Sequence, residues 1–181
     1  EKFEKEFASA HDRKFAVFTN SGTSSLHVAL AALKEKYNWQ NGDEVILPAL
    51  TFVATLNIIL QNGLRPVFVD IDPLTYNIDT TKIESLINEK TRAIIPVHLF
   101  GLSADMDSVM EIAKKRNLKV LEDSCETTLV SAQGHKVGSS GDISCFSTYM
   151  AHLITTGVGG LSCTDDEELA VIMKSLINHG R

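Results

Sequence analysis

The sequence has only three cysteines, Cys125, Cys145 and Cys163, and no pair of them has the spacing of a zinc site. An odd number of cysteines in or beside apolar segments argues against a disulfide framework and predicts reduced, mostly buried thiols. The sequence also lacks an apolar run long enough to cross a membrane, and it has no signal-peptide pattern. We therefore expect a cytoplasmic protein that does not act at a membrane.

Positive charge is scarce as well. The 17 lysines and arginines are outnumbered by 23 aspartates and glutamates, which gives a formal net charge of −6. This balance argues against a nucleic-acid partner. With 44% hydrophobic and 22% charged residues, the composition is that of a globular domain large enough for one sizeable core.

An initiator methionine is absent too. The sequence begins at Glu1 within a helical pattern and ends at Arg181, just after a helix-capping pattern. We expect residues 1–181 to be one domain of a longer protein.

Apolar, strand-like segments alternate with segments of helical spacing along the whole chain, without an internal repeat or a linker. Strands are expected at residues 15–18, 44–47, 66–70, 92–97, 118–123, 142–147 and 161–163. Helices are expected at residues 1–10, 26–33, 51–61, 79–88, 103–116 and 165–178, and a hairpin is expected around Gln133-Gly134. This alternation predicts an α/β fold, a mainly parallel sheet of about seven strands with helices on both faces.

Three polar segments, residues 21–25, 123–126 and 147–160, each follow a predicted strand. Ligands of open α/β sheets bind beyond the carboxyl ends of the strands, so these segments are expected to converge on one site. The first opens a helix with Ser21-Gly22-Thr23-Ser24-Ser25, where free N–H groups suit a phosphate. It is not a P-loop, and taken alone it is better explained as an ordinary helix cap.

Asp123 ends an apolar strand, with Glu122 before it and Glu126 three residues later. Such a carboxylate needs solvent, a metal or a cationic ligand as its partner, and a surface position is the simplest interpretation of the residue alone. His98 and His135 are conceivable metal ligands, but their spacing is not diagnostic and we predict no metal site.

Ser147 and His152 could form a nucleophile and base pair, but no Gly-x-Ser-x-Gly elbow surrounds the serine. A lone histidine in a loop is more often structural. A histidine that is free to act as acid or base contributes about 10²–10⁴-fold in rate.

Several short segments are more specific together than any of them alone. In chain order they are Asn20-Ser21-Gly22-Thr23-Ser24-Ser25-Leu26, Gly42-Asp43-Glu44-Val45-Ile46-Leu47-Pro48, Thr51-Phe52-Val53-Ala54-Thr55, Pro66-Val67-Phe68-Val69-Asp70-Ile71-Asp72, Pro96-Val97-His98-Leu99-Phe100-Gly101, Glu122-Asp123, Lys136-Val137-Gly138-Ser139, Gly141-Asp142-Ile143-Ser144-Cys145-Phe146-Ser147 and Gly159-Gly160. Over nearly its whole length the chain resembles the large domain of the fold-type-I, pyridoxal-phosphate-dependent sugar aminotransferases, the DegT/DnrJ/EryC1/StrS family. The resemblance implies a three-layer α/β/α domain.

The resemblance also implies roles for matching positions. Thr23 and Ser24 would hold the cofactor phosphate at a helix N-terminus, and Ser147 would add a hydroxyl. Phe52 would stack on the pyridine ring, and Asp123 would pair with the protonated pyridine nitrogen. That pairing keeps the ring cationic and able to take up electrons.

The important departure from the family is at His152. The usual phrase runs Phe-Ser-x-x-Pro-x-Lys, and its lysine binds the cofactor covalently, whereas here the seven residues from Phe146 end in His152. Imidazole cannot form a Schiff base with the cofactor aldehyde. No other lysine is a plausible substitute, since Lys136 precedes the strand and Lys174 lies well into the last helix.

The same replacement is found in one branch of the family, the nucleotide-sugar 3-dehydratases of deoxysugar biosynthesis. In that branch pyridoxamine phosphate binds without a covalent link, and the histidine acts as base at the cofactor's C4′ and promotes loss of the C3 hydroxyl of a 4-keto-6-deoxy sugar. A histidine of ordinary acidity is largely neutral at cytoplasmic pH. Glu126 also favours this branch, because the aminotransferases often carry Gln or His there. Leu153 and Val158 depart from it, in place of a second histidine and a glutamate.

The resemblance therefore predicts a dehydratase that uses pyridoxamine or pyridoxal phosphate on a nucleotide sugar, in deoxysugar or lipopolysaccharide biosynthesis. Two alternatives remain: a sugar aminotransferase, and a catalytically lapsed homologue that binds cofactor or sugar. The family also implies a homodimer with a shared active site and a smaller C-terminal domain, absent here, that supplies most sugar contacts.

Overall fold

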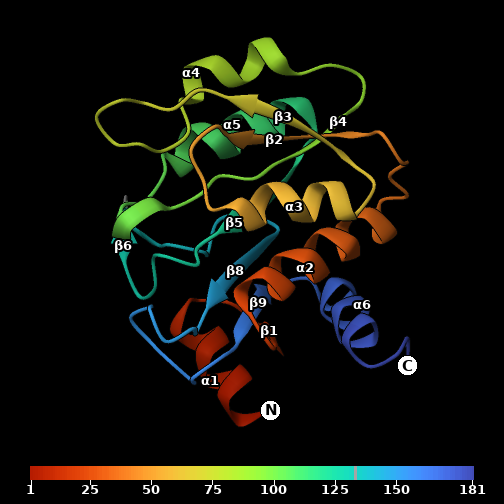
Figure 1. The fold of residues 1–181 in the computed structure, drawn as a ribbon, viewed down its shortest axis with the longest axis vertical. Coiled ribbons are helices and arrows are strands. Elements are labelled where there is room, and N and C mark those ends of the chain that lie inside the picture. The colour runs from red at the N-terminus through yellow and green to blue at the C-terminus, as the bar shows by residue number, and fades with distance from the viewer. Residues whose placement is uncertain (133) are drawn as a thin grey trace.

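The computed structural model describes residues 1–132 and 134–181. Its centre is a seven-stranded sheet in the order β1-β9-β8-β5-β4-β2-β3 (Figure 1). The strands are β1 (Phe15–Thr19), β2 (Glu44–Pro48), β3 (Arg65–Val69), β4 (Thr91–Ile94), β5 (Lys119–Asp123), β8 (Ile143–Ser147) and β9 (Gly160–Thr164). Only β9 runs antiparallel to its neighbours β1 and β8, and the other adjacent strands are parallel. The predicted mainly parallel sheet is confirmed.

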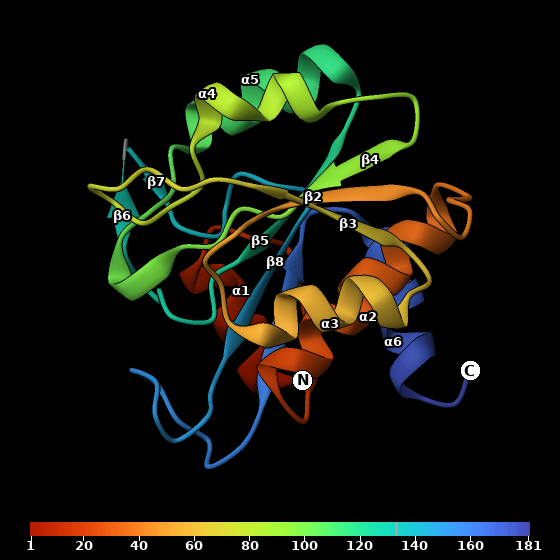
Figure 2. The same ribbon diagram turned by 45° about the horizontal axis from the view of Figure 1, so that its top comes forward.

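Helices cover both faces of the sheet (Figures 1 and 2). They are α1 (Lys2–Ala10), α2 (Gly22–Lys36), α3 (Val53–Gln61), α4 (Thr80–Ile83), α5 (Met106–Arg116) and α6 (Glu167–Ile177), with the short 3-10 helices η1 (Glu84–Leu86) and η2 (Leu99–Gly101). The predicted helix 79–88 is shorter than expected. It tightens into η1 after Ile83, and the backbone is already extended at Ile87, before β4 begins.

The two layers of helices follow from the alternation of side chains along the strands. In β2, Val45 and Leu47 pack in one cluster with α2, α3 and α6, whereas Ile46 between them packs with α4 and α5. β5 divides in the same way, with Leu121 on the first face and Val120 on the second. α1 lies on the second face, over β1, β8 and β9. The expected three-layer α/β/α arrangement is confirmed.

Outside the sheet, β6 (Ser131–Ala132) and β7 (His135–Lys136) form an antiparallel pair. The predicted hairpin falls here, although Gln133 lies outside the described residues. All three cysteines are free thiols, and burial raises the pKa of the Cys163 thiol to about 12. Among the described residues, no helix is long and apolar enough to cross a membrane.

Candidate functional site

The N-terminus of α2 meets the end of β8. Ser21 caps the helix, and its Oγ accepts a hydrogen bond from the backbone N–H of Ser24 at 3.1 Å. Gly22 packs so tightly here that a Cβ added to it would lie 2.7 Å from Cβ of Ser147. The glycine therefore lets a buried serine approach the helix end. The exposed Thr23 and half-buried Ser24 follow at the same turn, so the structure brings together three of the residues predicted to hold a phosphate.

Asp123 lies at the carboxyl end of β5, and only 3% of its surface is exposed. Its Oδ2 accepts a hydrogen bond from Oγ1 of Thr55 at 2.8 Å, and its Oδ1 accepts one from the backbone N–H of Cys125 at 3.2 Å. The Cys125 Sγ in turn lies 3.0 Å from the position of a Cβ on Gly22. Asp123 is therefore a buried carboxylate between the N-termini of α2 and α3, and the surface position that its sequence context alone favoured is wrong.

Phe52 stands at the N-cap position of α3, three residues before Thr55, and 66% of its surface is exposed. An aromatic side chain with this exposure leaves its apolar surface in water, at a cost of about 25 cal/mol per Å². The α3 N-terminus thus presents an uncovered ring on the same helical turn whose threonine contacts Asp123. A flat, apolar ligand could cover that ring.

Glu126 lies three residues beyond Asp123 and is half-buried. Its Oε2 accepts a hydrogen bond at 3.2 Å from the backbone N–H of Phe100, which belongs to η2. Phe100 has a left-handed backbone (φ 54°) and is 74% exposed. An exposed aromatic residue held at positive φ is uncommon, and such strain is often found at functional sites.

His152 lies in the loop of residues 148–159 between β8 and β9, which projects from the body of the molecule at the lower left of Figure 2. The loop is closed at its base. The backbone N–H of Thr156 donates to the Thr148 carbonyl at 3.0 Å, their hydroxyls are 2.8 Å apart, and Thr148 N–H donates to the Gly159 carbonyl at 2.9 Å. This closure restrains the loop that carries the histidine five residues past Ser147.

The half-buried His152 side chain packs edge-on against the ring of Tyr149, with ring centres 6.5 Å apart. Its backbone N–H donates to the Tyr149 carbonyl at 2.9 Å. Its imidazole makes no hydrogen bond to any residue that the structure describes. Neither ring nitrogen is therefore committed to a contact within the described part of the fold.

Lysine is absent from this loop. Lys136 lies on β7, where its Nζ donates to the Ala10 carbonyl at 2.9 Å and pairs with Asp12 at 3.3 Å. Lys174 is exposed on α6. Neither lysine shares an element with the residues gathered around Asp123.

Glu122 is a buried anchor whose role sequence reasoning did not identify. Its carboxylate accepts hydrogen bonds from the backbone N–H groups of Gly138 (3.0 Å), Ser140 (2.9 Å) and Gly141 (2.6 Å). Nε2 of His98 lies 3.1 Å away and a guanidinium nitrogen of Arg13 lies 3.4 Å away. These contacts tie three separate segments to the strand that carries Asp123. The signal in the sequence was a carboxylate directly after the apolar run of a central strand.

The surroundings of Glu122 determine its charge. Burial raises the pKa of this carboxyl, but the hydrogen bonds from His98 and Gly141 and the charge of Arg13 outweigh burial, so the pKa is lowered. His98 accepts the backbone N–H of Ala104 at Nδ1 (3.0 Å), so Nε2 carries the proton that faces the carboxylate. Both ring nitrogens of His98 are therefore occupied within the fold.

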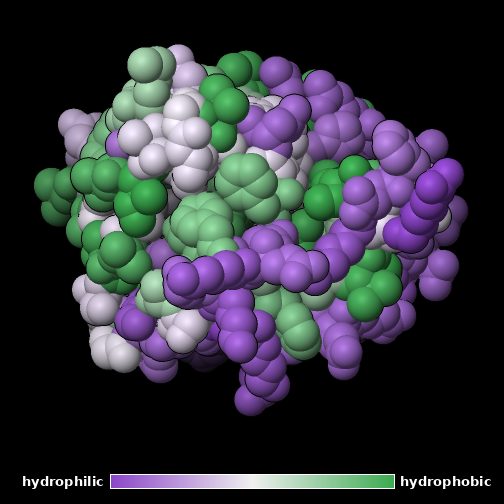
Figure 3. All heavy atoms as spheres, turned by 90° about the horizontal axis from the view of Figure 1, so that it is seen from below, coloured by the Kyte–Doolittle hydropathy of each residue, from purple (hydrophilic) through white to green (hydrophobic). Residues whose placement is uncertain are grey.

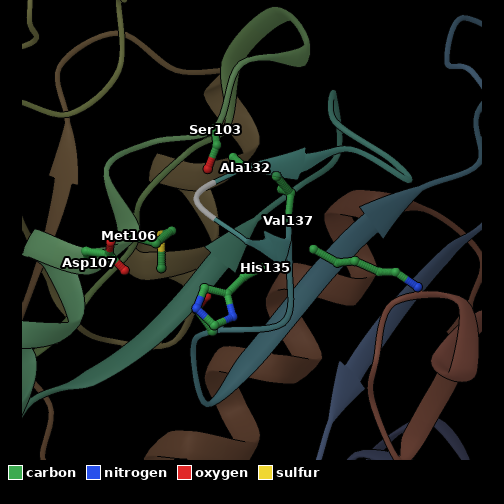
Figure 4. Close-up of a pocket in the computed structure, with 8 residues that line it drawn as sticks. Ser103, Met106, Asp107, Ala132, His135 and Val137 are labelled. Atoms are coloured by element: carbon green, nitrogen blue, oxygen red, sulfur yellow. The ribbon is translucent and has the colours of Figure 1, made fainter.

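His135, the other histidine considered as a metal ligand, lies away from this site. It lines a small cavity of about 10 Å³, beside Ser103 and the first turn of α5 (Figure 4). Such a volume accommodates about one water molecule. No group of three or more His, Cys, Asp or Glu side chains suited to a metal is found among the residues described.

Comparison with known proteins adds independent information. Residues 1–181 match the model of the DegT/DnrJ/EryC1/StrS aminotransferase family. The GDP-perosamine synthase of Caulobacter vibrioides is 44% identical over 99% of this chain and 47% of its own length. The GDP-4-keto-6-deoxy-D-mannose 3-dehydratase of Yersinia pseudotuberculosis is 39% identical over 99% of this chain and 46% of its own length.

A solved structure is similar over the same extent. The E. coli GDP-4-keto-6-deoxy-D-mannose-3-dehydratase with bound hydrated pyridoxal phosphate superposes with a TM-score of 0.94 at 35% identity, covering 99% of this chain and 45% of that one. The chain therefore spans about half the length of the curated relatives it matches.

Proposed function

The chain belongs to the DegT/DnrJ/EryC1/StrS aminotransferase family, and we propose that it is the cofactor-binding large domain of a nucleotide-sugar 3-dehydratase. The enzyme would use pyridoxamine phosphate to remove the C3 hydroxyl of a 4-keto-6-deoxy nucleotide sugar. His152 is the residue on which this proposal rests, because it stands where the family phrase has lysine. The dehydratase relatives in sequence and in structure support the proposal.

The phosphate of the cofactor would be held where α2 meets β8. The first N–H groups of a helix have no partner within the helix, and the helix dipole adds about 0.3–1 kcal/mol for an anion there. The hydroxyls of Thr23, Ser24 and Ser147 would complete this site. The close approach of Gly22 to Ser147 fits this role, since the serine reaches the helix end only when no side chain intervenes.

The ring of the cofactor would lie between Phe52 and the carboxylate of Asp123. The exposed ring of Phe52 supplies an apolar face, and Asp123 supplies a buried anion whose natural partner is a cationic N–H group. When bound, pyridoxamine phosphate supplies an amine and a ring that takes up electrons during bond cleavage. The donor set at this site therefore fits the group.

His152 would act as the base at C4′ of the cofactor, and Glu126 would border the same site. A neutral imidazole can accept a proton there and return it, which contributes about 10²–10⁴-fold in rate. Without a lysine on the loop of residues 148–159, the cofactor would be held by non-covalent contacts alone. The closed base of the loop would keep the imidazole in place during turnover.

We also propose that the protein is cytoplasmic and forms a homodimer with a shared active site. Apolar side chains around the site are unusually exposed: Phe52 66%, Phe100 74%, Met150 70%, Leu153 76% and Val158 64%. Figure 3, which views the end of the molecule where α1 lies, shows hydrophobic patches separated by hydrophilic surface. Exposed apolar surface of this kind marks an interface, and a second copy would cover it.

An aminotransferase is the second candidate. The perosamine synthase relative is more similar in sequence than the dehydratase relative, 44% against 39% identity. A catalytically lapsed homologue is the third, since Leu153 and Val158 replace residues that the dehydratase branch usually carries.

One assay separates these functions. The intact protein would be incubated with pyridoxamine phosphate, glutamate and a set of 4-keto-6-deoxy nucleotide sugars, and the products would be identified by mass spectrometry. We expect a 3-deoxy product. An amino sugar would identify an aminotransferase, and cofactor binding without turnover of any sugar would identify a lapsed homologue. A His152→Asn variant is the matched control and should bind cofactor without forming product.

A further inference from the structure

Two threonine hydroxyls, one just before α3 and one in its first turn, form a hydrogen-bonded row that ends on Asp123. Oγ1 of Thr55 donates to Oδ2 of Asp123 at 2.8 Å, and Oγ1 of Thr51 lies 2.8 Å from Oγ1 of Thr55. Thr55 has a single hydroxyl hydrogen, which points at the carboxylate, so the outer bond needs its hydrogen from Thr51. The other acceptor near the Thr51 hydroxyl, the Phe52 carbonyl, lies farther away at 3.4 Å. Both hydroxyl dipoles therefore point toward the carboxylate and strengthen one another.

The position of Thr55 is not explained by the helix alone. A threonine within a helix commonly donates its hydroxyl to the carbonyl three or four residues earlier. The Thr55 hydroxyl instead leaves its helix and crosses to β5, a strand 68 residues later in the chain. Thr55 is fully buried, and the hydrogen bond that its hydroxyl donates inside the protein goes to the Asp123 carboxylate.

The Asp123 carboxylate is fixed at both of its oxygens. Thr55 holds Oδ2, and the backbone N–H of Cys125 holds Oδ1. A carboxylate offers about four lone-pair sites, so two donors fix the orientation of its plane and leave the remaining sites open. A hydrogen bond weakens steeply as its angle departs from linearity, so this orientation decides how well a further donor can bind.

We propose that Thr55 is a positioning residue: it turns the open side of the Asp123 carboxylate toward the pyridine N–H of the cofactor. Thr51 in turn orients the Thr55 hydroxyl. This inference rests on the proposed cofactor site. Phe52 lies between the two threonines in the sequence. The start of α3 would therefore place the Phe52 ring that stacks on the cofactor. Through Thr55 it would also orient the Asp123 carboxylate that keeps the pyridine nitrogen protonated.

The test measures the pyridine proton directly. Pyridoxamine phosphate labelled with ¹⁵N in the ring is bound to the intact protein, and the ¹⁵N chemical shift is followed against pH for the wild type and for Thr55→Val, Thr55→Ser and Thr51→Val. We expect Thr55→Val to release the ring proton at a lower pH than the wild type and to bind the cofactor about 10-fold more weakly. Thr55→Ser keeps the hydroxyl and should match the wild type, and Thr51→Val should fall between them.

The outcomes are distinguishable from a failure of the proposed function. Wild-type protein that binds no pyridoxamine phosphate would refute the cofactor site and this inference with it. Wild-type binding combined with an unchanged pH midpoint and affinity in Thr55→Val would overturn only the role of Thr55. If Thr55→Val does not fold, Thr51→Val carries the same test. Thr51 is only half-buried, and its replacement leaves the hydrogen bond between Thr55 and Asp123 in place. An unchanged pH midpoint in Thr51→Val would then count against the inference.

Discussion

Replacing Glu122 by glutamine should destabilise the domain strongly although the two side chains have nearly the same shape. Glutamine has only one carbonyl oxygen, and its NH₂ group cannot accept a hydrogen bond. If the NH₂ group takes the place of Oε2, it faces the N–H of Gly138 and the protonated Nε2 of His98, which then lose their acceptor. His98 cannot move its proton to the other nitrogen without losing the bond from Ala104.

The magnitude follows from these contacts. Each buried donor without an acceptor costs about 1–3 kcal/mol. Removing one charge of a buried ion pair costs about 3–5 kcal/mol, and the Arg13 side chain opposite Glu122 is only 4% exposed. We therefore expect Glu122→Gln to lower the free energy of unfolding by about 3–5 kcal/mol, which is a large part of the roughly 5–15 kcal/mol that stabilises a typical domain. At about 2–4 °C for each kcal/mol, Tm should fall by about 6–20 °C.

Thermal and urea unfolding followed by circular dichroism would measure this loss. Asp165→Asn is the matched control, because Asp165 pairs with the same Arg13 at 3.0 Å but is 45% exposed. An exposed ion pair contributes about 0–1 kcal/mol, so the control should lose little stability. The pKa of Glu122 is lowered from its usual value of 4.5, so the stabilisation is present above pH 4.5 and is lost as the pH falls toward the folded-state pKa. A loss below about 1 kcal/mol for Glu122→Gln at pH 7 would refute this account of the buried anchor.

Two further predictions concern the cofactor site and the packing of α1. Gly22→Ala places a methyl group 2.7 Å from Cβ of Ser147, so the helix end and the serine must separate. In a fluorescence titration we expect the affinity for pyridoxamine phosphate to fall at least about 10-fold, near 1.4 kcal/mol. Unchanged affinity would show that the phosphate binds elsewhere. The ring of His11 packs between Phe7 and Phe146, and burial lowers its pKa. The folded state therefore favours the neutral ring, so the free energy of unfolding should decrease as the pH falls below 6.5. Urea unfolding at pH 8 and pH 6 would detect this, and a His11→Gln variant that keeps the same pH dependence would contradict it.

Much of the fold could be predicted because the sequence carries local signals for it. The uninterrupted apolar run of Val45, Ile46 and Leu47 predicts a strand that is buried on both faces. Aspartates before helices act as caps in the structure, and Asp79 is one of them. The cap fixed where that helix begins, but its early end at Ile83 depends on how the chain must turn into β4, which no local pattern records.

The candidate site was predictable in part. Ligands bind at the carboxyl ends of parallel strands, and this rule predicted that the polar segments would lie close together. In the structure the N-terminus of α2 lies beside Ser147 and near Asp123 at the end of β5. The contacts that hold these residues could not be predicted, because they join distant parts of the chain. Thr55 reaches Asp123 across 68 positions, and Arg13 reaches Glu122 across 109. Nothing in the local sequence distinguishes those side chains from ordinary surface residues.

The central claim is that His152 leaves the cofactor without a covalent link. Borohydride reduction with one equivalent of pyridoxal phosphate, followed by intact-mass and peptide analysis, tests it most directly. The wild-type protein should remain unlabelled under conditions in which a His152→Lys variant gains one cofactor on the new lysine, and His152→Gln should behave as the wild type. Stoichiometric labelling of a lysine in the wild-type protein would contradict the account, since the cofactor would then be tethered after all.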